Sequence, residues 1–363
     1  CNYYMFEYLL NNKDGWLNGK GPEAEIVFSS RIRLARNIAD LPFPSRASSA
    51  QKTEVLNRVK EAYPQVERLK NSTFVNMAEL STLDSQFLVE RHLISQEHAV
   101  SSKEKGLIMT GDEKISIMIN EEDHFRSQVI LSGFDLRKCW QILDGIDKDL
   151  EKKISFSFLP DLGYLTACPT NLGTALRASC MLHLPALALT KRINKILELL
   201  TRISFTTRGL FGEGTQALGN FFQISNQVSL GLSETELIDN LIGVVNQAKA
   251  QETDARNVLL GKHRISLEDN VWRALGTLRN SRLISSREAL SHLSILCLGL
   301  DLGIIKNTDL SSKGKGREII NNLFIIIQPA HLQKLESKSL KERERDYMRA
   351  EILRKKLGGE EDV

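Results

Sequence analysis

The first two-thirds of the chain alternates between short apolar runs and amphipathic stretches. Apolar runs of strand length predict β-strands at residues 26–28, 115–119, 154–158, 203–207 and 221–230. Apolar side chains at helical spacing predict helices at residues 50–63, which end before Pro64, and at residues 87–94. This mixture is typical of a domain built from both helices and strands.

The pattern changes after about residue 233, where apolar residues recur at helical spacing. Residues 234–255 predict one long helix, and Val271, Leu275 and Leu278 then recur at i, i+4 and i+7. The last third of the chain is therefore expected to be a helical bundle. We expect a short lead-in over residues 1–25, a mixed domain over residues 26–256 and an all-helical domain over residues 257–363.

Composition and charge exclude several classes of protein. The 363 residues include 48 Lys and Arg against 45 Asp and Glu, which gives a net charge of +3. Proteins that coat nucleic acid usually carry a larger basic excess, so we expect no direct nucleic-acid binding. The 5 cysteines form no CxxC pair, which favours a reducing compartment over disulfides or structural zinc.

No segment predicts a membrane span or secretion. The longest apolar run, residues 323–327, is much shorter than the roughly 18 residues that a spanning helix needs. The start of the chain lacks the basic region and the small-residue cleavage site of a signal peptide. We therefore expect a soluble, cytoplasmic protein that makes no contact with membranes.

The common nucleotide and metal motifs are absent from the sequence. There is no G-x-x-x-x-G-K-[ST] loop, no G-x-G-x-x-G after a strand, and neither the H-R-D nor the D-F-G motif of protein kinases. No H-E-x-x-H motif or cysteine cluster indicates a metal enzyme. If the chain binds a nucleotide, it does so by another route.

The positive signal is a set of arginines at the ends of predicted strands. Arg31 and Arg33 follow a strand at a spacing of two, which places them on one side of it. Arg126 follows an acidic turn, Arg177 lies in a Gly- and Thr-rich stretch, and Arg208 begins a glycine-rich loop. Together they could surround a triphosphate, because guanidinium groups suit phosphate oxygens and keep their charge. Each one alone is more often an ordinary surface arginine.

Four blocks that contain these arginines occur in a fixed order. They are residues 29–37 (SSRIRLARN), 120–126 (NEEDHFR), 168–177 (CPTNLGTALR) and 208–213 (RGLFGE). They resemble the signature blocks of the ATP:guanidino phosphotransferases, the family of creatine and arginine kinases. The resemblance implies an α+β fold, in which a phosphagen kinase-like domain, an antiparallel β-sheet flanked by helices as in glutamine synthetase, precedes the helical C-terminal domain.

The resemblance also implies where ATP binds. In the family the matching arginines bind the phosphates, and His92 matches a histidine that contacts the nucleotide. Mg²⁺ is expected with ATP, but no direct protein ligand for it, and Asp123 would reach the ion only through water. The implied ATP-binding residues are Ser29, Ser30, Arg31, Ile32, Arg33, His92, Arg126, Arg177, Ala178, Ser179, Cys180, Met181, Arg208, Gly209, Leu210, Phe211, Gly212 and Glu213.

Family resemblance assigns catalytic roles to Glu122, Glu213 and Cys168. A guanidinium group has a pKa above about 12, so it must be aimed at the phosphorus and relieved of a proton. A pair of carboxylates can do this, since each accepts N–H bonds from the planar fork. Without the resemblance, Glu122 would be read as part of an acidic surface turn and Cys168 as a small buried residue.

The sequence departs from the family pattern at a few positions. Ala175 stands where the family usually has glycine, and the extra methyl group is expected to tighten the phosphate loop slightly. Phe125 replaces an aliphatic residue, and Ser229 stands where phosphagen kinases have a further arginine. None of these changes removes a group with an assigned chemical role.

Two features narrow the resemblance to the bacterial protein-arginine kinases of the family. Only residues 1–28 precede the first block, where small-guanidine kinases carry a helical domain that closes over the acceptor. The helical C-terminal domain contains an RDxxRA motif, which implies an allosteric phosphoarginine-binding site and a role in dimerisation. The alternative is an ordinary charged helix turn. The implied site residues are Arg345, Asp346, Tyr347, Met348, Arg349 and Ala350.

The leading interpretation is a kinase that transfers the γ-phosphoryl group of ATP to arginine residues of proteins, which marks them for regulated degradation and relieves stress-gene repression. The resemblance implies partners: a McsA-type activator, a CtsR-type repressor as substrate, the ClpC–ClpP protease, and a second copy of the chain in a dimer or larger oligomer. The alternatives are a small-guanidine phosphagen kinase and a catalytically silent phosphoarginine-binding adaptor. A fourth alternative, a DNA-binding regulator, is disfavoured by the small net charge of +3.

Overall fold

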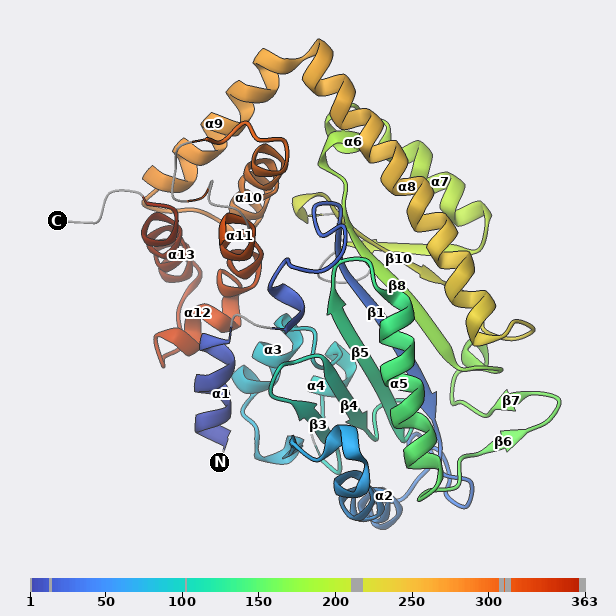
Figure 1. The fold of residues 1–363 in the computed structure, drawn as a ribbon. Helices are drawn as coiled ribbons and strands as arrows, with labels where there is room; N and C mark the ends of the chain where they lie inside the picture. The colour runs from blue at the N-terminus through green and yellow to red at the C-terminus, as the bar shows by residue number, and fades with distance from the viewer. Residues whose placement is uncertain are drawn as a thin grey trace.

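An eight-stranded antiparallel sheet forms the centre of the computed structural model (Figure 1), which describes residues 2–12, 15–101, 103–209, 218–306, 310 and 315–358. Every pair of neighbouring strands is antiparallel. In sheet order the strands are β2 (Ser72–Asn76), β3 (Gly106–Thr110), β4 (Ile115–Ile119), β5 (Phe125–Ser132), β1 (Val27–Arg36), β8 (Leu176–His183), β10 (Phe221–Asn226) and β9 (Phe205–Gly209). A separate hairpin pairs β6 (Phe158–Leu159) with β7 (Gly163–Tyr164).

Helices α5 (Leu136–Glu151) and α8 (Glu234–Lys262) cover one face of this sheet (Figure 1). Alternation along β1 explains the arrangement, because Ile32 and Leu34 are buried beneath α5 while Arg31 and Arg33, which alternate with them, point to the other face. Ser30 attaches the helix to the strand: its Oγ donates to the Gly133 carbonyl and accepts from the Asp135 N–H. The opposite face of the central strands is left for polar side chains.

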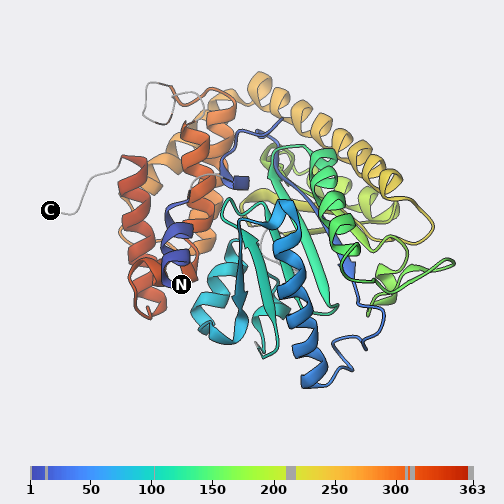
Figure 2. The ribbon, with the colours of Figure 1, turned by 60° about the horizontal axis from the view of Figure 1, so that its bottom comes forward.

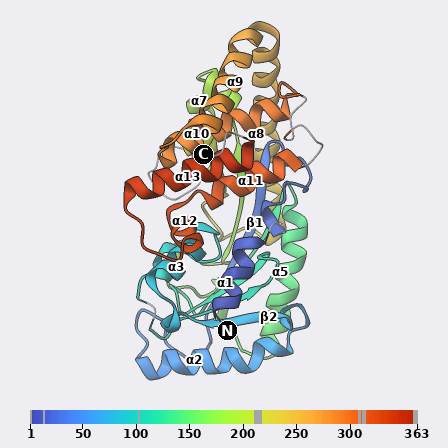
Figure 3. The same cartoon turned by 90° about the vertical axis from the view of Figure 1, so that its left-hand side faces the viewer.

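The C-terminal third is helical, as the periodicity predicts, and Val271, Leu275 and Leu278 are all buried. Helix α9 lies at the opposite end of the molecule from α2 (Figures 1 and 3). The C-terminal helices are α9 (Arg264–Asn280), α10 (Ser286–Asp301), α11 (Lys315–Ile326), α12 (Pro329–Leu335) and α13 (Glu342–Leu357). The remaining helices are α1 (Asn2–Asn11), α2 (Ser49–Ala62), α3 (Thr82–Glu90), α4 (Gln96–Ala99), α6 (Pro185–Leu189) and α7 (Ile193–Arg202).

Several predicted elements have other bounds in the structure. The strand predicted at 221–230 ends at Asn226, the one predicted at 203–207 is Phe205–Gly209, and the one predicted at 26–28 is Val27–Arg36. Two further elements differ more. The strand predicted at 154–158 is wrong: Phe156 makes only an isolated bridge to Ile38, and β6 begins at Phe158. The helix predicted at 87–94 is instead α3, because a capping box at Ser81 starts it earlier. It ends before His92, whose φ of 58° lies in the left-handed region that interrupts a helix.

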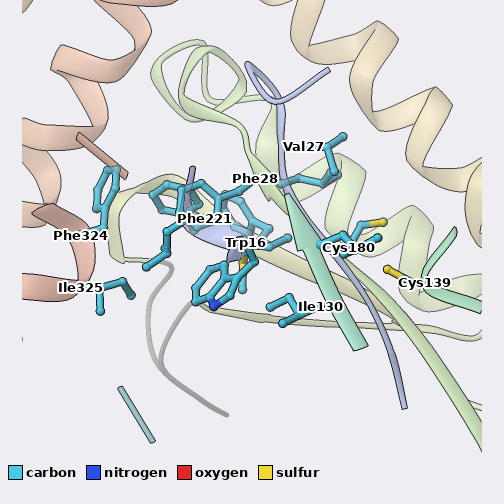
Figure 4. Close-up of a cluster of buried hydrophobic side chains, with 14 of the residues drawn as sticks. Trp16, Val27, Phe28, Ile130, Cys139, Cys180, Phe221, Phe324 and Ile325 are labelled. Atoms are coloured by element: carbon cyan, nitrogen blue, oxygen red, sulfur yellow. The ribbon is translucent and has the colours of Figure 1, made fainter. Parts of the chain in front are cut away.

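One hydrophobic core runs through the sheet and the C-terminal helices. Phe221 of β10 packs against Phe324 of α11 with ring centroids 4.7 Å apart, and against Phe28 of β1 at 5.0 Å (Figure 4). Trp16, in the segment expected to be a lead-in, is buried against Phe28. Helix α8 also continues through the expected domain boundary after residue 256. The helical part is therefore packed against the sheet rather than tethered to it.

Helix α3 packs against α12 next to α1 (Figure 2), and a buried polar junction joins the two helices. Glu90, the last residue of α3, accepts hydrogen bonds from the backbone N–H groups of Ala330 at 2.8 Å and His331 at 3.0 Å, and from Nδ1 of His331 at 2.7 Å. Next to it, Arg91 forms a buried ion pair with Glu113 at 2.6 Å. Glu90 thus caps the N-terminus of α12.

The stability of this junction should depend on pH. Burial raises the pKa of Glu90 from 4.5 to about 7, although hydrogen bonds from Ala330 and His331 oppose the shift. The folded protein therefore binds this proton more tightly than the unfolded chain, and its stabilisation is lost as the pH rises from about 4.5 through 7.

We expect the wild-type protein to lose roughly 2 kcal/mol more unfolding free energy than Glu90→Gln between pH 5 and pH 8. Urea unfolding at the two pH values measures this difference, and Glu67→Gln, at an exposed carboxylate, serves as the control. Equal pH slopes for wild type and Glu90→Gln would show that Glu90 is ionised throughout.

Candidate functional site

Strand register gathers the predicted arginines on the open face of the sheet. Arg33 of β1 pairs directly with Arg177 of β8, and Arg31 lies two residues earlier on the same side of β1. Arg126 comes from β5, on the other flank of β1, and Arg208 comes from β9 at the sheet edge. Residues that are scattered from 31 to 208 in the sequence therefore line one cleft.

The guanidinium groups repel one another. Burial, followed by Arg126, Arg177 and Arg208, lowers the pKa of Arg31 from 12.5 to about 10. Burial and the same neighbours, with Arg31, lower the pKa of Arg33 well below its usual value. Nε of Arg33 is buried and has no hydrogen-bond partner among the described residues. Such a cluster is suited to a ligand with several negative charges, such as a triphosphate.

The cleft consists of two cavities that meet at the arginines. One cavity, of about 490 Å³, includes His92 and the other, of about 570 Å³, includes Glu122 and Cys168. Arg33, Arg126, Arg208 and Glu97 line both. Each volume lies within the range of small-molecule sites, so the cleft can hold two reactants with the arginines between them.

The first cavity has the features of a nucleotide site. His92 lies beside a small pocket of about 20 Å³ that Trp16, Ser29, Met181 and other residues line. Burial, with a smaller effect of Arg31, lowers the pKa of His92 to about 3, so its ring is neutral. His92 also lines the cavity of about 490 Å³, where a neutral aromatic ring can contact a base without adding charge.

The predicted ATP-binding residues divide between the two faces of the strands. The side chains of Ser29, Arg31, Arg33, Arg177, Ser179 and Met181 lie on the cleft face, whereas those of Ser30, Ile32, Ala178 and Cys180 are buried on the face that packs against the core. Gly209 lines the first cavity. Leu210, Phe211, Gly212 and Glu213 lie outside the described residues.

The second cavity brings Glu122 and Cys168 together. Partial burial, then Asp123 and Glu121, raise the pKa of Glu122, so this carboxylate holds a proton more readily than usual. Glu121 differs, because hydrogen bonds of 2.5 and 2.7 Å from Arg126 help to lower its pKa to about 2 against the effect of burial. Sγ of Cys168 lies 3.0 Å from Oγ1 of Thr170. The cavity thus pairs a proton-accepting carboxylate with a partly buried thiol.

Asp123 holds these two groups in place. Its Oδ1 accepts hydrogen bonds from Nδ2 of Asn37 at 2.6 Å and from the Ala167 N–H at 2.7 Å. Asn37 also accepts from the His124 N–H at 2.9 Å. The turn that carries Glu122 and the loop that carries Cys168 are therefore fixed to the end of β1. Asn37 lies inside the first signature block, but its sequence position alone gives no sign of this role.

Other groups in the cleft carry no recognisable sequence signal. Glu97, at the short helix α4, lines both cavities, and no motif marks it. Gln223 accepts a hydrogen bond from Arg31 at 3.2 Å, and Thr206 accepts one from Arg177 at 3.0 Å. Gln223 on β10 and Thr206 on β9 each lie two strands from the arginine that they bind, so the sheet order and register are needed to place them in the cleft.

Ala175, where the sequence departs from the family pattern, has a φ of 52°. This is the left-handed region, where a residue with a Cβ is strained by about 1–2 kcal/mol and glycine is not. Alanine in place of glycine at position 175 therefore strains the backbone of this loop, which matters more than the volume of the added methyl group.

Replacement of Arg33 should weaken the binding of polyphosphate. We expect Arg33→Ala to bind ATP about 10- to 100-fold less tightly, because a charged hydrogen bond contributes about 1.5–3 kcal/mol. Calorimetric titration measures the affinity. Arg58→Ala, at an arginine paired with Asp40 outside the cleft, is the control. Unchanged affinity in Arg33→Ala would remove the cluster from the nucleotide site.

Comparison with known proteins agrees with this arrangement. Residues 54–255 match the family described as ATP:guanido phosphotransferase, C-terminal catalytic domain, and residues 264–362 match the protein-arginine kinase McsB C-terminal domain. The chain is 46% identical over 346 residues to the protein-arginine kinase of Halothermothrix orenii, which covers 95% of this chain and 97% of that protein. It is 45% identical over 353 residues to that of Moorella thermoacetica, with 96% and 99% covered.

Solved structures extend the likeness to the fold. Lombricine kinase has a TM-score of 0.57 at 27% identity and covers 65% of this chain and 68% of that chain. A duplicated taurocyamine kinase from Schistosoma mansoni has a TM-score of 0.58 at 24% identity, covers 65% of this chain and 34% of that chain, and shows the fold alone. The resemblance based on the signature blocks is confirmed, and so is the expected fold class. The chain belongs to the ATP:guanido phosphotransferase family.

Proposed function

We propose that this protein is a protein-arginine kinase, which transfers the γ-phosphoryl group of ATP to the guanidinium group of arginine residues in proteins. The observation that carries the proposal is the cleft itself, in which the arginine cluster separates a nucleotide cavity from a cavity that contains Glu122 and Cys168. The relatives that carry the name protein-arginine kinase match along nearly the whole chain.

In the proposed reaction the arginine cluster holds the phosphates and neutralises the charge that develops during transfer. Mg²⁺ would enter with ATP and, when bound, reduce the charge of the phosphates. The cleft fits this role, because arginines dominate its centre and carboxylates such as Glu97 and Glu122 lie at its walls. Positioning of the two reactants in line contributes much of the rate.

Glu122 is the residue that we assign to the proton of the acceptor. Its raised pKa suits a group that accepts N–H hydrogen bonds from the guanidinium and takes a proton as the P–N bond forms. Cys168, which lines the same cavity, is placed to contact the acceptor. Glu213 would supply the second carboxylate, which is a proposal from the family resemblance because residue 213 is not described.

The cellular role is a further part of the proposal. We infer that phosphorylation marks proteins for degradation by a ClpC–ClpP protease in the cytoplasm, that a CtsR-type repressor is one substrate, and that a McsA-type activator and self-association regulate the enzyme. The names of the relatives and the match to the C-terminal domain of McsB support this role indirectly. No helix among the described residues is both long and apolar enough to cross a bilayer.

The RDxxRA motif is proposed as the allosteric phosphoarginine site, and it lies on α13. Arg349 is buried and donates hydrogen bonds to the carbonyl groups of Ile327 at 3.0 Å and Ile284 at 2.9 Å, and to Asp346 at 2.5 Å. Arg345 is half-buried and donates to the Leu340 carbonyl at 2.7 Å. Arg345 is therefore the more accessible of the two for a phosphate. Tyr347 is exposed, Met348 is half-buried and Ala350 is buried.

Replacement of Glu122 tests the proposed reaction. We expect Glu122→Gln to lower arginine phosphorylation by roughly 100-fold or more and to leave ATP affinity nearly unchanged, because the base acts on the acceptor. The measurement is mass spectrometry of a loosely folded protein incubated with MgATP at neutral to basic pH, since the P–N bond is acid-labile.

Glu67→Gln, an exposed carboxylate outside the cleft, is the control for this experiment. Phosphate on free arginine or creatine but never on protein would favour a small-guanidine phosphagen kinase. Binding of phosphoarginine without any transfer would favour a silent adaptor.

Replacement of Arg345 tests the second site. We expect Arg345→Ala to weaken the binding of free phosphoarginine about tenfold, through loss of one charged hydrogen bond. Arg349→Ala should also lower stability by about 1–3 kcal/mol, because it leaves buried carbonyl groups without a donor. Calorimetric titration is the readout, and Arg343→Ala, exposed on the same helix, is the control. Unchanged phosphoarginine binding and activity in the double Arg345 and Arg349 variant would exclude the site.

A further inference from the structure

Exposed apolar side chains gather on two segments beside the acceptor cavity. The β6–β7 hairpin carries Phe158 and Leu159, which are 53% and 46% exposed, and Leu162 at its tip is 40% exposed. The loop between β10 and α8 carries Val228 and Leu230, each 49% exposed. Clusters of large exposed apolar residues are uncommon on proteins without a binding partner for them.

Both segments are attached to the loop that forms the wall of the acceptor cavity. That loop contains Cys168, Thr170 and Asn171, which line the cavity. The hairpin is joined to its end by hydrogen bonds from the Tyr164 N–H to the Gly173 carbonyl at 2.8 Å and from the Gly173 N–H to the Leu162 carbonyl at 2.9 Å. The hairpin lies next to the start of α8 in both views of the ribbon (Figures 1 and 2).

The second segment is attached on the other side of the same loop. Oγ of Ser229 donates to the carbonyl groups of Thr170 at 3.3 Å and Leu172 at 2.8 Å. One short stretch of chain thus lines the cavity on its inner side and carries apolar segments on its outer sides. Both apolar segments are therefore attached to the stretch that forms the cavity wall.

Contacts of Tyr164 attach the base of the hairpin to β1. The guanidinium of Arg36 lies 3.4 Å from the ring centroid of Tyr164, and Arg36 is itself fixed by a buried ion pair with Asp147 at 2.7 Å. Phe158 packs edge-on against the same tyrosine with centroids 5.2 Å apart. The structure thus maintains an exposed apolar surface that hydration alone would disfavour.

The acceptor cavity and the apolar segments outside it together suit an arginine that is part of a polypeptide. The cavity offers the carboxylates of Glu97 and Glu122 to a guanidinium, whereas residues 227–233 of the outer loop contain no charged side chain. When an arginine side chain enters the cavity, the backbone on either side of it must leave over the rim. The residues next to that arginine would therefore lie over the apolar segments.

We propose that the β6–β7 hairpin and residues 228–232 form a docking surface for apolar residues that flank the acceptor arginine. The occupant is an extended segment of the substrate protein whose apolar side chains are exposed, as in an unfolded region. This inference rests on the proposed protein-arginine kinase activity and adds a preference among acceptor arginines. The size of this preference depends on how much apolar area of the substrate's flanking side chains is buried on the docking surface.

Two synthetic peptides with one arginine each test the proposal, one with leucines beside the arginine and the other with glycines. The wild-type enzyme should phosphorylate the leucine peptide with a kcat/KM about tenfold higher, which corresponds to burial of roughly two methylene groups. The double variant Phe158→Ser with Leu159→Ser should lose this preference, through a fall for the leucine peptide alone. Leu230→Ser, on the other segment, should reduce it as well.

The control is Ile265→Ser, which removes an 84% exposed isoleucine from α9 and should preserve the preference. Thermal unfolding verifies that each variant is folded, and Leu230→Ser provides an independent test if the hairpin variant is unstable. Equal kcat/KM for both peptides in the wild type, or a preference that survives in both surface variants, overturns the proposal while the kinase activity stands.

Two other outcomes also overturn the proposal. If the wild type phosphorylates neither the peptides nor a loosely folded protein, even with the proposed activator added, the proposed function fails and the docking surface fails with it. If the surface variants change the oligomeric state in size-exclusion chromatography and leave the peptide preference intact, the apolar segments form an interface with a second copy of the chain instead.

Discussion

Repulsion among the guanidinium groups on one face of the sheet is the constraint on which the rest of the structure depends. Arg31 and Arg33 share one strand and lie near Arg126 and Arg177 on the neighbouring strands, so strand pairing fixes the backbone positions of these arginines close together. Burial of both groups makes the repulsion stronger than it would be in water. An antiparallel sheet with α5 and α8 packed on its other face can hold such a cluster rigidly. The binding of a polyanion then relieves unfavourable energy that is already present, which helps the site to discriminate in favour of a triphosphate over less charged ligands.

The same rigidity determines what the acceptor side can do. A nucleophilic guanidinium must meet the terminal phosphate at a defined distance, and small displacements reduce the rate steeply. Asp123 and Asn37 fix the Glu122 turn and the Cys168 loop to the end of β1, the strand that carries Arg31 and Arg33. The groups that hold the phosphates and the groups that line the acceptor cavity are therefore both positioned by one strand, β1. Asp123 is buried and its Oδ1 already accepts two hydrogen bonds, so its main role in this structure is to position its neighbours.

The sequence allowed the central features to be predicted wherever local pattern and tertiary structure agree. The strand at 115–119 and the helices after residue 233 were predicted well, because their apolar periodicity is the same property that buries them. The arginines were found from their blocks, whereas their placement on one face needed strand pairing, which period-2 alternation suggests only within β1. Glu97, Gln223 and Thr206 were missed because they enter the cleft from other elements. The strand predicted at 154–158 is wrong for a different reason. Ile154 and Phe156 are buried as the alternation predicts, but Phe156 forms only an isolated bridge to Ile38 and the stretch adds no strand to the central sheet.

The cleft and the C-terminal helices meet through a short segment between α11 and α12. Arg349 of the RDxxRA motif donates to the carbonyl of Ile327, and the next residue, Gln328, lines the nucleotide cavity. Glu90 lines the same cavity and caps α12 at Ala330 and His331. A ligand that draws Arg349 away from the Ile327 carbonyl would leave a buried acceptor without its donor, and residues 327–331 would have to rearrange to satisfy it. Because Gln328 and Glu90 are part of the cavity wall, that rearrangement would alter the nucleotide site. If the RDxxRA motif binds phosphoarginine as proposed, ATP would by linkage alter that affinity by the same factor.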